Sequence, residues 1–323
     1  MPALDFLIFL LDIYFTIDYT ETKFSTNERE VFFMSASTIL LIFMWIFAIA
    51  FIIILVKDVK AHKQELDKTK LGFNSIISLI ANFFDTLGIG SYAIATSAWK
   101  FNKSISDDLI PGTLNVAFAI PICVEATITM TRISVDPLTL VLMIGSAILG
   151  SILGAKIISR MDIMKIRVIM GIALLIVAAV TLCKINAIGP FGMVGTARGL
   201  SGAMLVIGVI GNFILGILMT AGIGLYAPCM ALILLLGMST DVAFPIMMGS
   251  CAFLCPACGI TFIKEGKYQR GATIPMLIAG SIGVLIAGFI VTSLPLTLLT
   301  YLVCIVMVIC AVLFFHDAKK QKK

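Results

Sequence analysis

The chain has 323 residues, 60% of them hydrophobic and only 13% charged, and its formal net charge is +5. Soluble domains carry about 25% charged residues, so this composition excludes a soluble globular protein and indicates a polytopic helical membrane protein. A membrane barrel is excluded as well, because its strands would alternate apolar and polar residues.

The N-terminal part of the chain contains one long apolar run. Residues 1–30 are expected to form an interfacial segment, because Asp5 and Asp12 interrupt an apolar stretch that lacks the basic start of a signal peptide. Residues 31–56 carry no charge and predict one extra N-terminal transmembrane helix. Residues 57–70 contain five Lys and predict a cytoplasmic linker.

A short motif occurs twice in the rest of the chain. Residues 88–93 read GIGSYA, and residues 222–227 read GIGLYA, 134 positions later. The same offset pairs Pro111 with Pro245, so the register holds over 24 residues and indicates an internal duplication. Its predicted parts are a first transmembrane repeat at 71–184, a hinge at 185–199, a second repeat at 200–315 and a basic cytoplasmic tail at 316–323.

Each repeat is predicted to be a Gly-broken helical hairpin followed by three spanning helices. The segments after the breaks, 91–101 and 225–237, are short, and a helix over 91–101 covers only about 16 Å, half a bilayer. Asp107 and its duplicate Asp241 are expected to begin the next helices. The other predicted helices are 71–87, 109–130, 138–158 and 168–183 in the first repeat, and 200–219, 242–263, 273–292 and 296–315 in the second.

The distribution of positive charge predicts the orientation. Suppose that the 57–70 linker is cytoplasmic and that each Gly-broken hairpin enters and leaves on one face. The Lys and Arg that then lie outside are Lys23, Arg29, Arg132, Lys184 and Arg198. All the other Lys and Arg then lie on the cytoplasmic side, which is a strong positive-inside bias. The second repeat is therefore inverted relative to the first, and the two hairpin tips can meet near the midplane.

The two breaks are the candidate substrate site. Non-helical backbone inside a bilayer persists only where it is buried in protein or lines a wet cavity. The helix that begins after each break offers free N–H groups and the positive end of its dipole, which suit a small anion. The alternative is that the glycines only allow close helix packing, but their duplication favours a site. The candidate substrate-binding residues are Gly88, Gly90, Ser91, Tyr92, Thr96, Asn115, Gly222, Gly224, Tyr226 and Ser250.

Two acidic residues lie inside predicted spans and are candidates for coupling. Asp85 precedes the first break and has no acidic counterpart in the second copy, an asymmetry that suits coupling to a proton or a cation. The alternative for Asp85 is a capping or interhelical hydrogen bond. Glu125 is the second candidate.

Three cysteines suggest a different class of function. Cys251, Cys255 and Cys258 could serve a membrane thiol enzyme that uses a quinone or a metal. They lie in a predicted span without the strand–helix setting of a thioredoxin site, and no second Cys pair or His completes a zinc shell. The expectation is therefore buried thiols, no metal, no cofactor and no enzymatic activity.

These features resemble the TauE/SafE (TSUP) family of bacterial sulfite and organosulfonate exporters. The resemblance covers residues 71–315, and in each copy a glycine element carries it. The residues concerned are Gly88-Ile89-Gly90 and Ala95-Thr96-Ser97 in the first copy, and Gly222-Ile223-Gly224, Pro228, Gly237 and Ala243 in the second. Tyr92 and Tyr226 stand where the family usually has further glycines, and the first copy lacks a match for Pro228. The resemblance implies a small sulfur-containing anion such as sulfite, a sulfonate or thiosulfate.

The sequence as a whole predicts a secondary transporter of a small anion, working by alternating access between two inverted halves. No ATP-binding motif is present, so the driving force is expected to be a gradient, with coupling to a proton or a cation. The expected setting is a bacterial inner membrane, with a cytoplasmic C-terminus. The expected partners are the anion and the lipid bilayer, without nucleic acid, and a homodimer is one option. The alternatives are the thiol enzyme, an anion channel and a membrane-embedded binding subunit.

Overall fold

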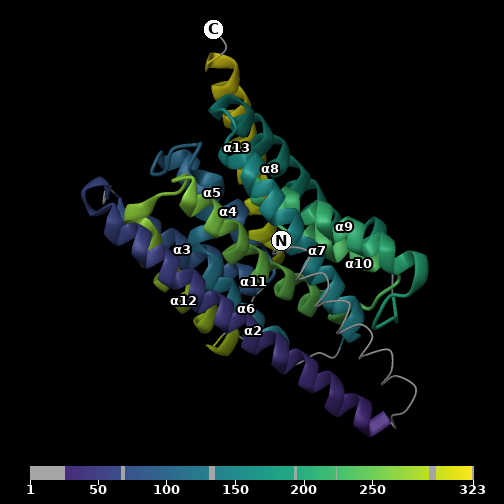
Figure 1. The fold of residues 1–323 in the computed structure, drawn as a ribbon. Helices are drawn as coiled ribbons and strands as arrows, with labels where there is room; N and C mark the ends of the chain where they lie inside the picture. The colour runs from purple at the N-terminus through teal and green to yellow at the C-terminus, as the bar shows by residue number, and fades with distance from the viewer. Residues whose placement is uncertain are drawn as a thin grey trace.

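The computed structural model describes residues 26–66, 70–130, 135–192, 195–222, 224–290 and 296–321. Within these ranges the chain is built of α-helices joined by short turns (Figure 1). Most of the interfacial segment predicted for residues 1–30 lies outside them, so that prediction stays untested.

The helices follow the predicted order. The chain begins with α2 (Thr26–Ala61) and the short turn η1 (Lys63–Glu65). The next group is α3 (Leu71–Thr86), α4 (Ser91–Asn102), α5 (Ile110–Ala117), α6 (Ala119–Met130), α7 (Pro137–Ser159) and α8 (Ile163–Ile185). After η2 (Gly189–Gly192) come α9 (Gly202–Thr220), α10 (Tyr226–Leu235), α11 (Thr240–Lys264), α12 (Arg270–Ile290) and α13 (Leu296–Gln321).

The length and apolar character of the helices confirm a multi-pass helical membrane protein. Six helices in the described ranges are long and apolar enough to cross a membrane, and the bent pair α5–α6 would make a seventh. The helices after the breaks are short, as predicted: α4 has 12 residues and α10 has 10. At about 1.5 Å per residue, neither reaches across a bilayer.

The structure differs from the sequence prediction at the start and middle of the span predicted for 109–130. This span is two helices, α5 and α6, bent by 45° at Phe118. Pro121 has no N–H for the carbonyl of Ala117, four residues earlier, and its ring crowds that position, so a straight helix cannot form. Asp107 does not begin the helix, because α5 starts only at Ile110.

The start of α11 also differs from the prediction. Its N-cap residue is Ser239 rather than Asp241. The segment between α10 and α11 is held by backbone hydrogen bonds to the predicted hinge. Ala197 forms a parallel bridge with Met238, in which the Ala197 amide donates to the Gly237 carbonyl at 3.2 Å.

Helices from the two halves of the sequence pack against each other rather than forming separate bundles. In particular, α3 packs on α12, α7 packs on α9, and α8 packs on α13. Glycines allow two of these contacts. A Cβ added at Gly150 on α7 would lie 2.1 Å from the Phe213 carbonyl oxygen of α9, and one added at Gly283 on α12 would lie 2.2 Å from the Leu79 carbonyl oxygen of α3. The backbones are thus too close for any side chain at either position.

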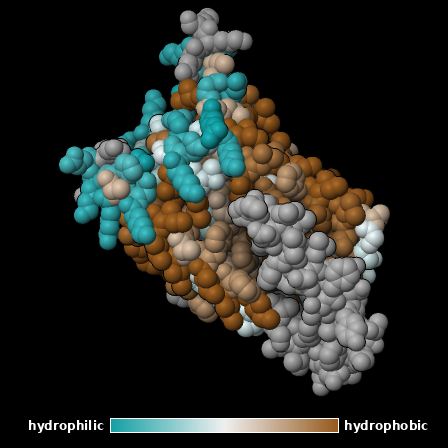
Figure 2. Space-filling view, in the orientation of Figure 1, coloured by the Kyte–Doolittle hydropathy of each residue, from teal (hydrophilic) through white to brown (hydrophobic). Residues whose placement is uncertain are grey.

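Polar groups gather at one end of the molecule, while the sides of the bundle are hydrophobic (Figure 2). At this polar end Lys100 of α4 lies 2.7 Å from Asp107 and 2.8 Å from Asp317 of α13, and Arg167 of α8 lies 2.7 Å from Asp107. Nearby, Lys267 lies 3.2 Å from Asp108. Several loops that the sequence analysis assigned to one face therefore do lie together.

Candidate functional site

The first break ends α3 with a glycine turn that closes its last carbonyls. The Gly88 amide donates to the Asp85 carbonyl at 2.8 Å, and the Ile89 amide donates to the Phe84 carbonyl at 3.0 Å. This is the Schellman pattern, which needs a left-handed residue after the helix, and Gly88 has φ +90°. Gly90, with φ +95°, then precedes the first residue of α4 and provides no capping side chain.

The second break repeats this geometry. The Gly222 amide donates to the Met219 carbonyl at 2.9 Å, and Gly222 has φ +94°. Gly224 has φ +70°, and α10 begins two residues later, at Tyr226, again without a capping side chain. The two turns therefore share both their hydrogen bond and their backbone conformation, as the duplicated sequence predicts.

The two breaks lie against each other in the fold. A Cβ added at Gly224 would lie 3.8 Å from the Cβ of Tyr92, the second residue of α4. Between the breaks is a cavity of about 40 Å³ whose walls also include residues of α6, α8 and α11. Such a volume holds about three water molecules or one small ion. The two breaks thus lie together in the fold, with a partly open cavity between them.

Five of the predicted site residues and one coupling candidate line this cavity. They are Gly88, Gly90, Ser91, Tyr92 and Gly224, together with Asp85. The carboxylate Oδ2 of Asp85 accepts a hydrogen bond from Ser91 Oγ at 2.5 Å, and both residues are buried. Because Ser91 is the first residue of α4, this carboxylate lies at the start of that helix. The hydrogen-bonding alternative named for Asp85 is therefore realised.

A cation that the sequence analysis placed on the outer side of the membrane also reaches the cavity. Lys184, in the last turn of α8, extends its Nζ to within 3.1 Å of the Gly88 carbonyl oxygen and lines the cavity wall. The signal for it was available, since Lys184 is the one charged residue of 168–185. Its position at the end of a predicted span indicated a loop instead.

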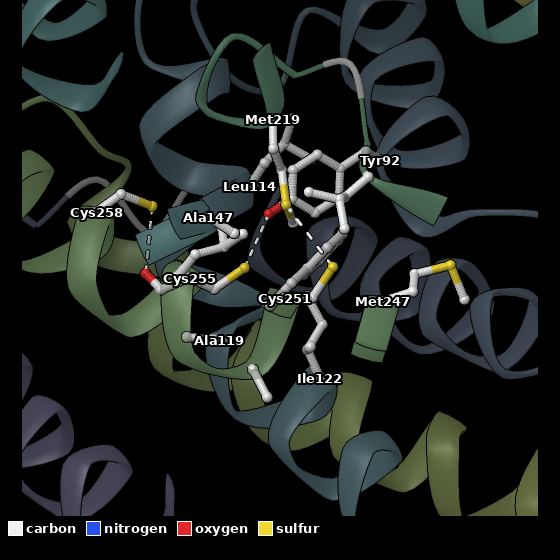
Figure 3. Close-up of a cluster of buried hydrophobic side chains, with 14 of the residues drawn as sticks. Tyr92, Leu114, Ala119, Ile122, Ala147, Met219, Met247, Cys251, Cys255 and Cys258 are labelled. Atoms are coloured by element: carbon white, nitrogen blue, oxygen red, sulfur yellow. Dashed lines mark hydrogen bonds between the residues drawn. The ribbon is translucent and has the colours of Figure 1, made fainter. Parts of the chain in front are cut away.

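Tyr92 connects the cavity with the thiols of α11 (Figure 3). Tyr92 lines the cavity, but its hydroxyl donates to Asn115 Oδ1 at 3.1 Å and lies 3.3 Å from Cys255 Sγ. Cys258 Sγ donates to the same Asn115 oxygen at 3.2 Å. The Tyr92 hydroxyl is thus engaged in the helix core and is not directed at the cavity.

Of the other predicted site residues, those whose side chains are described do not line the cavity. Ser250 Oγ accepts from Asn212 Nδ2 at 3.0 Å, and Thr96 and Asn115 are fully buried between helices. Gly222 is in the second turn, outside the lining, and the side chain of Tyr226 is not among those described. Whether any of these residues contacts a substrate remains a prediction.

Glu125, the second coupling candidate, is buried on α6 and does not line the cavity. Its Oε2 has no hydrogen-bond partner among the described residues. It lies close enough to Asp85 for the two charges to interact. The structure thus leaves Glu125 outside the cavity that Asp85 lines.

The three cysteines of the alternative hypothesis are free thiols buried on α11. Cys251 lines the cavity and its Sγ lies 3.8 Å from Met219 Sδ (Figure 3). Cys255 and Cys258 do not line the cavity and hydrogen-bond inside the core. Over the described ranges, no group of three His, Cys, Asp or Glu side chains is arranged to hold a metal ion.

Comparison of the chain with protein-family models, with curated proteins and with solved structures finds no match. The resemblance to the TauE/SafE family is therefore neither supported nor refuted by these comparisons, and the site is interpreted from its own geometry.

Proposed function

We propose that this protein is a secondary transporter that moves a small anion across the membrane by alternating access. The observation that carries the proposal is the cavity between the two glycine breaks. Each break interrupts a helix at depth, both adopt the same turn, and they enclose one small space. Broken helices that meet at the interface of two repeats are the usual construction of a transporter binding site.

Equivalent contacts in the two halves support inverted repeats as the framework of this site. On α7, Gly150 contacts the α9 backbone at Phe213, and on α12, Gly283 contacts the α3 backbone at Leu79. The two glycines are 133 positions apart and the two partners are 134 apart. Exchanging the halves thus maps one close contact onto the other, as a two-fold relation between repeats requires.

A second pair of contacts obeys the same exchange. Ser78 Oγ of α3 donates to the Met276 carbonyl of α12 at 2.6 Å, and Asn212 Nδ2 of α9 donates to the Met143 carbonyl of α7 at 2.8 Å. Ser78 and Asn212 are 134 positions apart, and the two methionines are 133 apart. These contacts support a duplication that extends through four helices, α3, α7, α9 and α12.

The proposed substrate is a small anion, and the resemblance narrows it to sulfite, a sulfonate or thiosulfate. Two features favour negative charge in the cavity. One is Lys184, whose ammonium lies at the first break. The other is the start of α10 beside Gly224, where no side chain caps the free amides.

The proposed access route leads from the end opposite to the polar cluster. At the polar end, Lys100 pairs with Asp107 and Asp317, and Arg167 pairs with Asp107 and donates to the Asp317 carbonyl. These contacts join α4, α8 and α13. The cavity instead has Thr181 and Lys184 of α8 in its wall, from the other end of that helix. We assign the polar end to the cytoplasm of a bacterial inner membrane, following the positive-inside rule.

Uptake of radiolabelled thiosulfate or sulfite into proteoliposomes tests the proposal. Gly224→Ala should abolish uptake, because a Cβ strains the φ +70° turn at the cavity. Gly202→Ala is the matched control: Gly202 has φ +54° and open space around it, but lies at the start of α9, away from the cavity. Equal losses in both variants, or transport unchanged in both, would refute the cavity as the site.

The same assay tests two of the alternatives. A Cys251→Ser, Cys255→Ser, Cys258→Ser triple variant should retain uptake, whereas a thiol enzyme would lose its function. A channel would show no counterflow, so accelerated exchange of labelled anion against an internal pool distinguishes a carrier from it.

A further inference from the structure

We propose that Asp85 is an internal competitor for the transported anion, so that each anion bound is accompanied by one proton. This inference rests on the proposed function and specifies how coupling occurs. The Asp85 carboxylate lies at the start of α4 and accepts the Ser91 hydroxyl at 2.5 Å. It therefore occupies the place and uses the donor that an anion at the first break would need.

The size of the cavity makes this competition unavoidable. Asp85, Ser91, Gly224 and Lys184 all line a space of about 40 Å³. An anion that contacts both helix starts would lie within a few ångströms of the Asp85 carboxylate. Like charges at such a distance repel strongly in a low-dielectric interior, so the anion and the ionised carboxylate cannot both be accommodated.

The charged groups around Asp85 do not neutralise an added anion, and protonation of Asp85 would compensate for its charge. Lys184 on α8 provides a positive charge at the break. Glu125 on α6 can only add negative charge. Among the described residues, the thiols of Cys251 and Cys255 on α11 also interact with Asp85, whereas the hydroxyl of Tyr92 on α4 is directed into the helix core. An entering anion thus adds a charge that the cavity residues do not compensate, unless Asp85 takes up a proton.

The second break has no carboxylate at the position equivalent to Asp85, so the two breaks have different roles. The residue equivalent to Asp85 is Met219, whose sulfur contacts Cys251. An anion can therefore contact the start of α10 without displacing a protein group. It reaches the start of α4 only when a proton from the solvent forms an O–H bond on Asp85. The Ser91 hydroxyl then transfers its hydrogen bond from the carboxylate to the anion.

Proton uptake on anion binding tests the inference with the full-length purified protein. Calorimetric titration of thiosulfate in buffers of different ionisation enthalpy should give about one proton bound per anion for the wild type. Asp85→Asn, a neutral side chain of the same shape, should bind thiosulfate with about zero proton uptake. Glu265→Gln, which removes a carboxylate that pairs with Arg160 and lies outside the cavity lining, should keep the wild-type uptake, which makes it the matched control.

The wild type alone provides a second measurement if Asp85→Asn does not fold. When binding takes up one proton, affinity falls about tenfold for each unit that the pH rises above the titration of the coupled group. Thiosulfate binding that is independent of pH, or a proton uptake retained in Asp85→Asn, overturns the inference and leaves the transporter proposal standing. Absence of binding by every small sulfur anion tested overturns the proposed function and this inference with it.

Discussion

The two glycine breaks have the same backbone and different side chains. Both end a helix with a left-handed glycine after the same type of hydrogen bond. At the first break, Asp85 and Ser91 bond to each other and Lys184 lies on the turn. At the second, Met219 contacts the Cys251 thiol. The two turns are therefore alike in backbone, while among the described residues the charged groups lie at the first break.

The comparison extends to the far ends of the two short helices. The last turn of α4 carries Lys100, which pairs with Asp107 and Asp317. The last turn of α10 is apolar, and the segment after it is held by backbone hydrogen bonds to the hinge through Ala197. One half-helix is thus anchored by charge and the other by backbone pairing. Only the anchoring of α4 therefore depends on the charge state of ionisable side chains.

The largest effect is expected where the two halves are most alike. Gly150→Ala and Gly283→Ala each place a methyl group about 2 Å from a backbone oxygen of the facing helix. Each should destabilise the protein by about 1–3 kcal/mol, because α7 must separate from α9 or α12 from α3. Thermal unfolding of the purified variants measures this. Gly72→Ala, with open space around it, is the control.

Equal destabilisation by the two substitutions would sharpen the comparison, since it shows that the repeats use the same contact. A large loss at Gly150 with none at Gly283 would break it and argue against a two-fold relation between the halves.

The sequence predicts this symmetric framework well, because the features that define it are local. Apolar runs gave the helices to within a few residues, and the doubled motif located both turns and their contact. The bend at Phe118 lies near Pro121, but proline alone does not locate it, because Pro256 and Pro275 lie inside the continuous helices α11 and α12. The features that the sequence did not predict depend on contacts between distant segments. Asp107 was assigned to a helix start, yet its carboxylate is used by Lys100 and Arg167. No local pattern carries that information.

Lys184 shows the same limit at the site itself. Its side chain turns back from the end of α8 to the first break, a contact across 96 positions. A lysine at a span end is expected to extend to the membrane surface, and that expectation places it outside. In the structure, Lys184 instead bonds to the Gly88 carbonyl and lines the cavity.

An intermediate effect is expected from removing this cation. Lys184→Gln keeps a donor for the Gly88 carbonyl but removes the positive charge, so it isolates the electrostatic contribution at the first break. Thiosulfate affinity should fall about tenfold or more, the usual scale for losing a charged partner. Lys156→Gln, at an exposed position on α7, should leave affinity unchanged. Unchanged affinity in both variants would place the anion away from the first break.

The smallest effect is expected at the anchored end of α4. Asp317 lies beyond the apolar part of α13, and its hydrogen bond with Lys100 holds its pKa below the ordinary value of 3.8. A carboxylate with a lowered pKa stays ionised above that value, and its contribution is lost only as the pH falls through the lowered pKa. This ion pair therefore persists throughout the range in which transport is measured.

Asp317→Asn should accordingly change the uptake rate by no more than about threefold, because Lys100 keeps Asp107 and a half-exposed ion pair contributes little. More importantly, the variant should retain the wild-type pH dependence of uptake between about pH 6 and pH 8. Rates measured across this range in proteoliposomes test it. If the pH dependence disappears in Asp317→Asn while Asp85→Asn retains it, the proton acts at the anchored end of α4 and not at its start. The difference between the two breaks would then have no part in coupling.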